Sequence, residues 1–213
     1  MRLLAIDTTG PDCSVALRVA GQADHCMTET IGQGHAERLG LMVEALLAEA
    51  GCAPSELTRI GVATGPGSFA GSRIGVAFAR GLALATGAIA VGIGNLEAIA
   101  RTAGGDGPLA ILHDAKRGEL VLQVRGAAGL SAPERLSLEQ APGRICQLAG
   151  PVGRLAGSGA ALISLDGFTD TGITQMHLAD LLDLAAAADP ALALPAPFYA
   201  RPPDAKLPGG LEP

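Results

Sequence analysis

The glycine-rich segment 65–75, with the sequence GPGSFAGSRIG, combines residue types that are able to bind an anion. It follows a strand-like run and leads into a long apolar helical pattern. Because Pro66 has no backbone donor and glycine admits positive φ, Gly65 and Gly67 predict a turn, with Ser68 as the helix N-cap. Such a turn directs backbone N–H groups outward, where they would hold a phosphate. The alternative is a tight turn that only brings the helix close to the sheet.

A second candidate is the turn Asp7-Thr8-Thr9-Gly10, which ends the first strand-like run. A carboxylate and two hydroxyl groups on one turn are suited to Mg²⁺ or a phosphate. The same residues are ordinary turn formers, so a structural turn is the alternative. The segment 65–75 also lacks both the P-loop ending Gly-Lys-Ser/Thr and a Gly-x-Gly-x-x-Gly pattern. The candidate nucleotide pocket, which we regard as vestigial, consists of Asp7, Thr8, Thr9, Gly65, Gly67 and Ser68.

The histidines and serines give no pattern for metal binding or nucleophilic catalysis. No two histidines lie three to five residues apart, as a helical metal pair requires. Ser68 and Ser158 lie in glycine-rich turns, but neither is framed by Gly-x-Ser-x-Gly, and no base is assignable. We therefore expect no catalytic residue and no bound metal. The four histidines are His25, His35, His113 and His177.

Two helical segments carry apolar or small residues on more than one face. In the helix expected over 35–50, a broad stripe faces a core, and Leu41, Ala45 and Ala48 form a narrower stripe on the other side. The helix that follows Ser68 repeats this feature with small residues and paired arginines. Such faces suit docking with another chain, the alternative being a solvated face in an alanine-rich protein. The predicted interface residues are His35, Arg38, Leu41, Ala45, Ala48, Arg73, Val76, Arg80 and Ala83.

Composition narrows the class of protein. The 213 residues are 48% hydrophobic and 17% charged, which is enough apolar material for a sizeable core. The formal net charge is −6, and the two lysines, Lys116 and Lys206, form no basic run, so any RNA should be held mainly by another subunit. We expect no signal peptide, no membrane span, reduced cysteines and a cytoplasmic location.

The order of expected elements predicts an α/β protein. Strands over 3–6, 14–19 and 24–30 precede the helix 35–50, the strand 59–64, the helix after Ser68 and the strand 88–92. Strands over 109–113, 119–125 and 154–156, a short helix near 138–148 and a helix over 176–188 follow. We expect three parts: an N-terminal subdomain (1–104), a smaller C-terminal subdomain (105–193) and a proline-rich tail over the surface (194–213).

These features together resemble the bacterial TsaB (YeaZ) family. The resemblance is close over residues 1–102 and thinner beyond them. It implies two related α/β subdomains of the actin-like or sugar-kinase-like ATPase superfold, with a β-β-β-α-β-α core and a cleft between them. Its motifs are LLAIDTT at 3–9, CSVAL at 13–17, His35-x-x-Arg38-Leu39 and the segment 65–75, with weaker matches at 114–119, 157–160 and 197–202.

The resemblance also implies a function. The family is the dimerization subunit of the tRNA threonylcarbamoyladenosine machinery, and it docks through its first two helices on the catalytic paralog TsaD, joined by the ATPase TsaE. An exposed docking face of this kind also predicts a homodimer when the chain is alone. We expect only indirect contact with tRNA and no tightly bound cofactor, with any binding of ATP and Mg²⁺ confined to the complex. Residues 92–97 lack the paralog's histidine pair, and Ala70 and Ser72 stand where threonine and valine are usual.

Two other functions are weighed against this one. The first is an ATP-dependent phosphotransferase of the same superfold acting alone, with Asp7, Thr9 and the turns 65–68 and 157–159 around Mg-ATP. Against it, no second carboxylate is clearly placed as a base. The second is a metallopeptidase, which the missing metal ligands disfavour.

Overall fold

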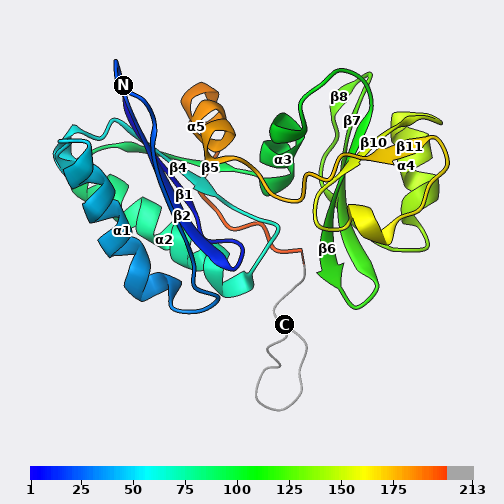
Figure 1. The fold of residues 1–213 in the computed structure, drawn as a ribbon, viewed down its shortest axis with the longest axis horizontal. Coiled ribbons are helices and arrows are strands. Elements are labelled where there is room, and N and C mark those ends of the chain that lie inside the picture. Colours follow the sequence, from blue (N-terminus) through cyan, green and yellow to red (C-terminus); the bar gives the residue numbers. More distant parts are fainter. Residues whose placement is uncertain (201–213) are drawn as a thin grey trace, which may run out of the picture.

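Two β-sheets stand side by side in the computed structural model, which describes residues 1–200 (Figure 1). The first sheet has five strands in the order β3-β2-β1-β4-β5. The second has the order β11-β10-β6-β7-β8, with β9 also paired to β7. The predicted α/β class is therefore confirmed.

The first sheet is built around β1 (Arg2–Asp7), whose four central residues are buried. β1 pairs antiparallel with β2 (Asp12–Val19) and parallel with β4 (Arg59–Ala63). The outer strands are β3 (His25–Thr30) and β5 (Ile89–Ile93). Because four consecutive residues of this central strand, 3–6, are apolar and buried, both faces of the sheet are covered.

Two helices cover one face of the first sheet. α1 (His35–Glu49) and α2 (Phe69–Thr86) bury Leu39, Met42 and Val76 against the strands. α2 ends at Gly87, whose φ of 78° is a left-handed conformation that glycine adopts without strain. A short 3₁₀ turn, η1 (Pro54–Glu56), links α1 to β4.

The second sheet repeats the pairing scheme of the first. β6 (Leu109–Lys116) pairs antiparallel with β7 (Glu119–Gly126) and parallel with β10 (Gly153–Ala156). α4 (Ala141–Ala149) packs against β7 and β6, and the 3₁₀ turn η2 (Ala160–Leu162) follows β10. The short strands are β8 (Gly129–Leu130), β9 (Glu134–Ser137) and β11 (Phe168–Asp170).

The helix that follows each half packs against the other half. α3 (Asn95–Ala103), which was not predicted, lies against β6, β7 and β10, whereas α5 (Leu178–Ala187) covers the free face of the first sheet. Gly61 permits this approach, because a Cβ there would collide with the Cβ of Ala185. Residue 104, the predicted boundary, lies between the strands of the first sheet and those of the second. The helices cross this boundary: α3 precedes it but covers the second sheet, and α5 follows it but covers the first.

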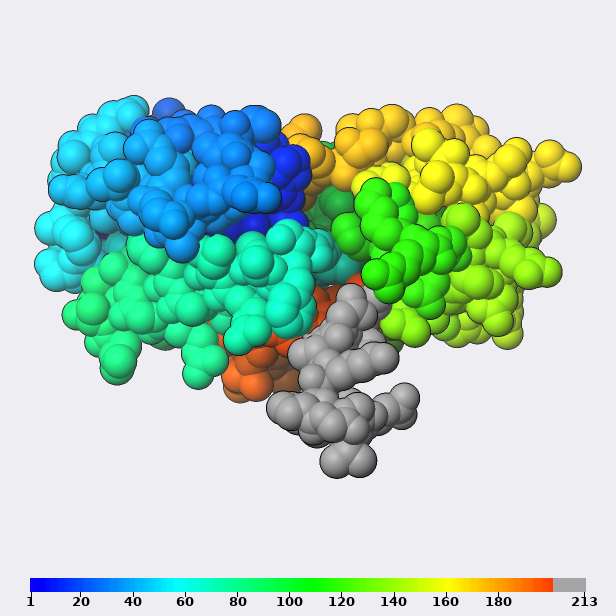
Figure 2. Space-filling model, turned by 90° about the horizontal axis from the view of Figure 1, so that it is seen from below, coloured from blue at the N-terminus to red at the C-terminus, as the bar shows by residue number. Residues whose placement is uncertain are grey.

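The segment after α5 returns along the first sheet and then reaches the second. The Gly92 N–H donates to the carbonyl oxygen of Ala193 at 2.9 Å, and the Phe198 N–H donates to Thr64 at 2.8 Å. Figure 2 shows this orange-red segment beside the helices of the first half. The rest of the predicted tail, 201–213, lies outside the described residues. Within residues 1–200, no helix combines the length and the hydropathy that crossing a membrane requires.

Candidate functional site

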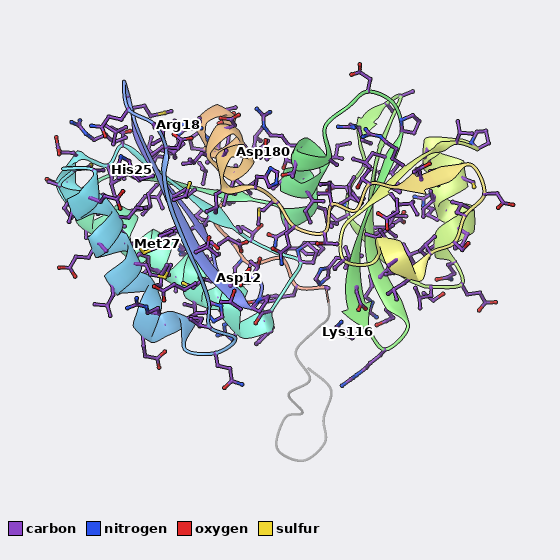
Figure 3. All side chains as sticks on the ribbon, in the orientation of Figure 1. Asp12, Arg18, His25, Met27, Lys116 and Asp180 are labelled. Carbon is purple, nitrogen blue, oxygen red and sulfur yellow. The ribbon has the colours of Figure 1, made fainter. Side chains whose placement is uncertain are left out.

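A cleft of about 500 Å³ lies between the two halves. The first half contributes the β1–β2 turn, with Asp7, Thr9 and Asp12, and Asn95 at the start of α3. The second half contributes His113 and Ser158, and residues 174–179, which lead into α5 and form its first two residues, also line the cleft. In Figure 3, Asp12 lies at the edge of the first half that faces the second.

The carboxylate of Asp7 is held by one of its two oxygens. Oδ1 accepts hydrogen bonds from the Thr9 N–H at 2.8 Å and the Thr9 hydroxyl at 2.6 Å. The Asn95 side-chain amide donates to that same hydroxyl oxygen at 2.6 Å, so the network is continuous from the turn to α3. Burial raises the pKa of Asp7, and the Thr9 hydrogen bonds oppose this rise only in part. The turn thus positions a carboxyl group whose charged form is disfavoured.

The glycines of segment 65–75 allow α2 to lie directly on the β1–β2 turn. A Cβ at Gly71 would collide with the carbonyl oxygen of Thr8, and one at Gly67 would lie 2.5 Å from the carbonyl oxygen of Thr9. A Cβ at Gly75 would lie 2.5 Å from the Thr8 hydroxyl. That hydroxyl donates to the carbonyl oxygen of Gly71 at 2.7 Å. The spacing of four residues between these glycines is therefore required by packing.

Several backbone donors of the same segment are used within the chain. The Gly65 N–H donates to the side-chain oxygen of Asn95 at 2.9 Å, and the Ser68 N–H donates to Thr9 at 2.7 Å. Ser68 is the N-cap of α2, as predicted, because its hydroxyl accepts from the Gly71 N–H at 3.1 Å. With these donors occupied, the geometry favours the tight turn over the phosphate cradle.

The opposite wall of the cleft carries a neutral imidazole. The Nδ1 atom of His113 lies 3.4 Å from the Ser158 hydroxyl oxygen, which also accepts from the Asp114 N–H at 3.1 Å. Burial lowers the pKa of His113, so its uncharged form is favoured. The described residues that line the cleft include no lysine or arginine. A polyphosphate would meet the carboxylates of Asp7 and Asp12 without a compensating basic side chain.

The part of the chain that the structure describes contains no group of three or more histidine, cysteine, aspartate or glutamate side chains able to hold a metal ion. The residues in the candidate nucleotide pocket are thus brought together, but as one packed and hydrogen-bonded network. Asn95, the residue that links its two turns, was not among the predicted pocket residues.

The exposed side of α1 carries the narrower apolar stripe that the sequence predicted, Leu41, Ala45 and Ala48. The side chain of Leu41 is 55% exposed, and Ala45 and Ala48 are exposed beside it. Arg38 is also exposed, but its guanidinium is paired with the carboxylate of Glu29 at 2.6 Å. This pair lowers the pKa of Glu29 through the hydrogen bond.

Two predicted interface residues are not on the surface. Val76 is buried in the core beneath α2, and His35 is buried with its Nε2 3.2 Å from the carbonyl oxygen of Asp12. Including them in the predicted interface was wrong. The exposed side of α2 runs through Arg73, Ala77 and Arg80 and not through Val76, and His35 is held at the start of α1 against β2. Arg73 and Arg80 are exposed and Ala83 is half-buried.

The sequence reasoning also missed the most exposed apolar side chain of α2. Leu84 is 89% exposed and lies four residues after Arg80. Its spacing of seven residues from Ala77 and eleven from Arg73 was the signal that would have found it. We define the two-helix face as the exposed residues Leu41, Ala45, Ala48, Arg73, Ala77, Arg80 and Leu84.

Comparisons with known proteins place this geometry in a family. The family model described as TsaD, tRNA N6-adenosine threonylcarbamoyltransferase, matches residues 27–134, which is half of the chain. The tRNA threonylcarbamoyladenosine biosynthesis protein TsaB of Haemophilus influenzae is 36% identical over 103 residues, which cover 48% of this chain and 43% of that protein. The matched region therefore spans less than half the length of this curated relative.

Solved structures match over a greater length. YeaZ from Pseudomonas aeruginosa is 28% identical with a TM-score of 0.73, and the match covers 93% of this chain and 99% of that one. A Bacteroides thetaiotaomicron protein with an actin-like ATPase fold is 7% identical with a TM-score of 0.51, which shows the fold alone. The chain thus belongs to the family of tRNA N6-adenosine threonylcarbamoyltransferase homologues and, within it, to the TsaB (YeaZ) branch.

Proposed function

We propose that this chain is a non-catalytic assembly subunit in tRNA threonylcarbamoyladenosine biosynthesis, which binds a catalytic partner of the TsaD type and activates it. A role in this biosynthesis is supported by its relatives, which are named tRNA threonylcarbamoyladenosine biosynthesis protein TsaB. The match to the TsaD family model supports a partner that shares the fold of this chain.

The observation that carries the proposal is the two-helix face. α1 buries one apolar stripe in the core and leaves a second one in solvent, centred on Leu41. α2 adds Leu84 and the small residue Ala77, which let another helix approach closely. Apolar surface of this kind on ordered helices is a mark of an interaction site.

Activation would follow from binding alone. If the partner's active conformation binds the two-helix face more tightly than its inactive conformation, the complex populates the active one. In this proposal the ATPase TsaE joins the pair, ATP and Mg²⁺ bind only in the complex, and the partner holds the tRNA. The isolated chain would form a homodimer through the same face, and it would work in the cytoplasm.

The alternative proposal is an ATP-dependent phosphotransferase acting alone. In its favour, the cleft brings Asp7 and Ser158 to opposite walls of one cavity. Against it, the cleft lining has acidic but no basic side chains, and the Gly65 and Ser68 N–H groups already donate within the chain, which offers little to a triphosphate.

Reconstitution separates these two functions. Threonylcarbamoyl transfer to tRNA and ATP binding are measured for this chain, for the TsaD-type partner, and for the mixture with TsaE. We expect transfer only in the mixture. Turnover or tight ATP binding by the lone chain would overturn the assembly role and favour the phosphotransferase.

A double variant tests the face itself. Leu41→Glu with Ala45→Glu should weaken partner binding at least about 100-fold in calorimetry, because it places two charges in an apolar contact. The melting temperature should stay close to that of the unmodified chain, since Leu39, Met42 and Leu46 hold the core from the other side. The matched control is Gln147→Glu on the exposed side of α4, which should leave binding unchanged. Unaltered binding by the double variant would refute the interface.

A further inference from the structure

The C-terminal segment carries an unusual exposed cluster onto the start of α2. The chain has four phenylalanines, one tyrosine and no tryptophan, yet Phe69 and Tyr199 stack with ring centroids 4.9 Å apart. The guanidinium carbon of Arg73 lies 5.3 Å from the centroid of the Phe69 ring. Both rings remain exposed, Phe69 at 45% and Tyr199 at 42%. Two of the five aromatic side chains are thus exposed and in contact with each other, and the guanidinium of Arg73 lies over one of them, Phe69.

The backbone on both sides of Tyr199 is fixed. The Phe198 N–H donates to Thr64 at 2.8 Å, and the Phe198 side chain packs with the cluster around Leu96. The carbonyl oxygen of Ala200 accepts from the guanidinium of Arg135, on β9, at 3.4 Å. The Tyr199 ring is therefore presented at one place on the surface, with little conformational freedom left to lose on binding.

Two glycines of the first half make room for this segment. A Cβ at Gly92 would lie 2.5 Å from the carbonyl oxygen of Leu194, and one at Gly65 would lie 3.0 Å from that of Phe198. Gly65 belongs to the segment 65–75, so the same turn that positions α2 also receives the C-terminal segment. We call residues 193–200 the strap.

The cluster continues the two-helix face. Arg73 belongs to both, and Phe69 lies one helical turn before it on the exposed side of α2. Rigid aromatic rings and arginine are the side chains most enriched at the energetic centres of protein interfaces. The exposed neighbours of the cluster on the first turns of α2, Ala70 and Ala77, are small, so the two rings are not covered from that side.

We infer that the strap is a third element of the partner-docking surface and that Tyr199, with Phe69 and Arg73, is an anchor for the partner. This inference rests on the proposed function and concerns the same TsaD-type partner. The site suits a partner segment that offers an apolar side chain to the two rings and a carboxylate to Arg73, whose guanidinium lies over the Phe69 ring.

The test measures partner affinity by calorimetry for single variants of the full chain. Tyr199→Ala should weaken binding at least tenfold. Tyr199→Phe should bind within twofold of the unmodified chain, because it keeps the aromatic ring that contacts Phe69. The matched control, Leu192→Ala, removes an 83% exposed apolar side chain that precedes the strap and should bind normally.

The outcomes separate the anchor from the interface as a whole. If Tyr199→Ala binds within twofold while Leu41→Glu with Ala45→Glu abolishes binding, the strap is not an anchor and the assembly role stands. If the unmodified chain does not bind the partner, both proposals fall. A melting temperature for Tyr199→Ala within a few degrees of that of the unmodified chain excludes unfolding as the cause of weaker binding. If the melting temperature falls further, Arg73→Gln is measured in its place. The anchor predicts that Arg73→Gln weakens partner binding at least threefold.

Discussion

The two halves share one strand scheme and differ in what covers it. In each, a central strand has an antiparallel neighbour on one side and two parallel strands on the other. The first half carries helices of 15 and 18 residues, α1 and α2, whereas the second carries the 9-residue α4 and the 3-residue η2. The two halves thus have similar sheets. Only the helices of the first half are long enough to cover the core and still leave an exposed side for a partner.

The turns that end the parallel strands are also equivalent. The Ser68 N–H donates to Thr9 at 2.7 Å in the first half, and the Gly159 N–H donates to Leu112 at 2.9 Å in the second. In both halves a glycine approaches the central strand closely, Gly71 at Thr8 and Gly157 at Leu112. Only the first half follows this turn with a long helix, and the strap docks on that helix.

The largest effect is expected where α2 meets the β1–β2 turn. Gly71→Ala should destabilise the chain by about 3 kcal/mol, because the added Cβ collides with the Thr8 carbonyl. Gly81→Ala in the same helix has no atom within 4 Å of the new Cβ and should be neutral or stabilise by about 0.5–1 kcal/mol. Urea unfolding of both variants measures the difference. Equal stabilities would mean that α2 does not need this close approach.

Short-range pattern was enough to predict most elements. The apolar runs of β1, β2 and β4 and the N-cap at Ser68 depend on neighbours in the sequence, and these predictions are confirmed. α3 was missed because it has nine residues and begins after Gly94, which provides no side-chain cap.

The long-range features were out of reach for a physical reason. A helix phase defined by alanines and glycines is uncertain by about one residue, so Val76 was placed outside and Leu84 was overlooked. The approach of Tyr199 to Phe69 and of Asn95 to Thr9 joins segments 130 and 86 residues apart, and no local spacing encodes such contacts.

A smaller effect is expected where α5 joins the halves. The carboxylate of Asp183 accepts from Arg18 on β2 at 2.7 Å and from Arg101 on α3 at 2.6 Å. Asp183→Asn should cost about 1 kcal/mol or less, since these groups are partly exposed, whereas Asp166→Asn at an exposed site should cost nothing.

The same carboxylate predicts a pH dependence. Arg18, and then Arg101, lower the pKa of Asp183, so its contribution is present above the ordinary pKa of aspartate and is lost as the pH falls through the lowered one. Asp183→Asn should therefore differ from the unmodified chain at pH 7 and match it at strongly acidic pH. Thermal unfolding across pH measures this, and a constant difference at every pH would contradict the ion pairs.

The smallest effects distinguish the two walls of the cleft. Because the pKa of Asp7 is raised, the folded state favours its protonated form, and stability is lost as the pH rises through that pKa. Asp7→Asn should thus stabilise the chain at pH 7 by about 0.5 kcal/mol and lose this advantage in acid.

The opposite wall should respond with the opposite sign. The pKa of His113 is lowered from its ordinary value of 6.5, so the unmodified chain loses stability as the pH falls below that value, and His113→Asn should remove this loss. Parallel melting curves at several pH values compare both variants. The same sign for both would show that the two walls do not differ in this way.

The crossed packing of α3 and α5 bears on how the chain is made. During synthesis the strands of the first sheet emerge early, but the helix that seals their inner face ends at residue 187. Until then Leu3, Ala5 and Val91 have no apolar cover on that side. The nascent first half must therefore keep this apolar face uncovered until α5 has also been synthesised and has left the ribosome.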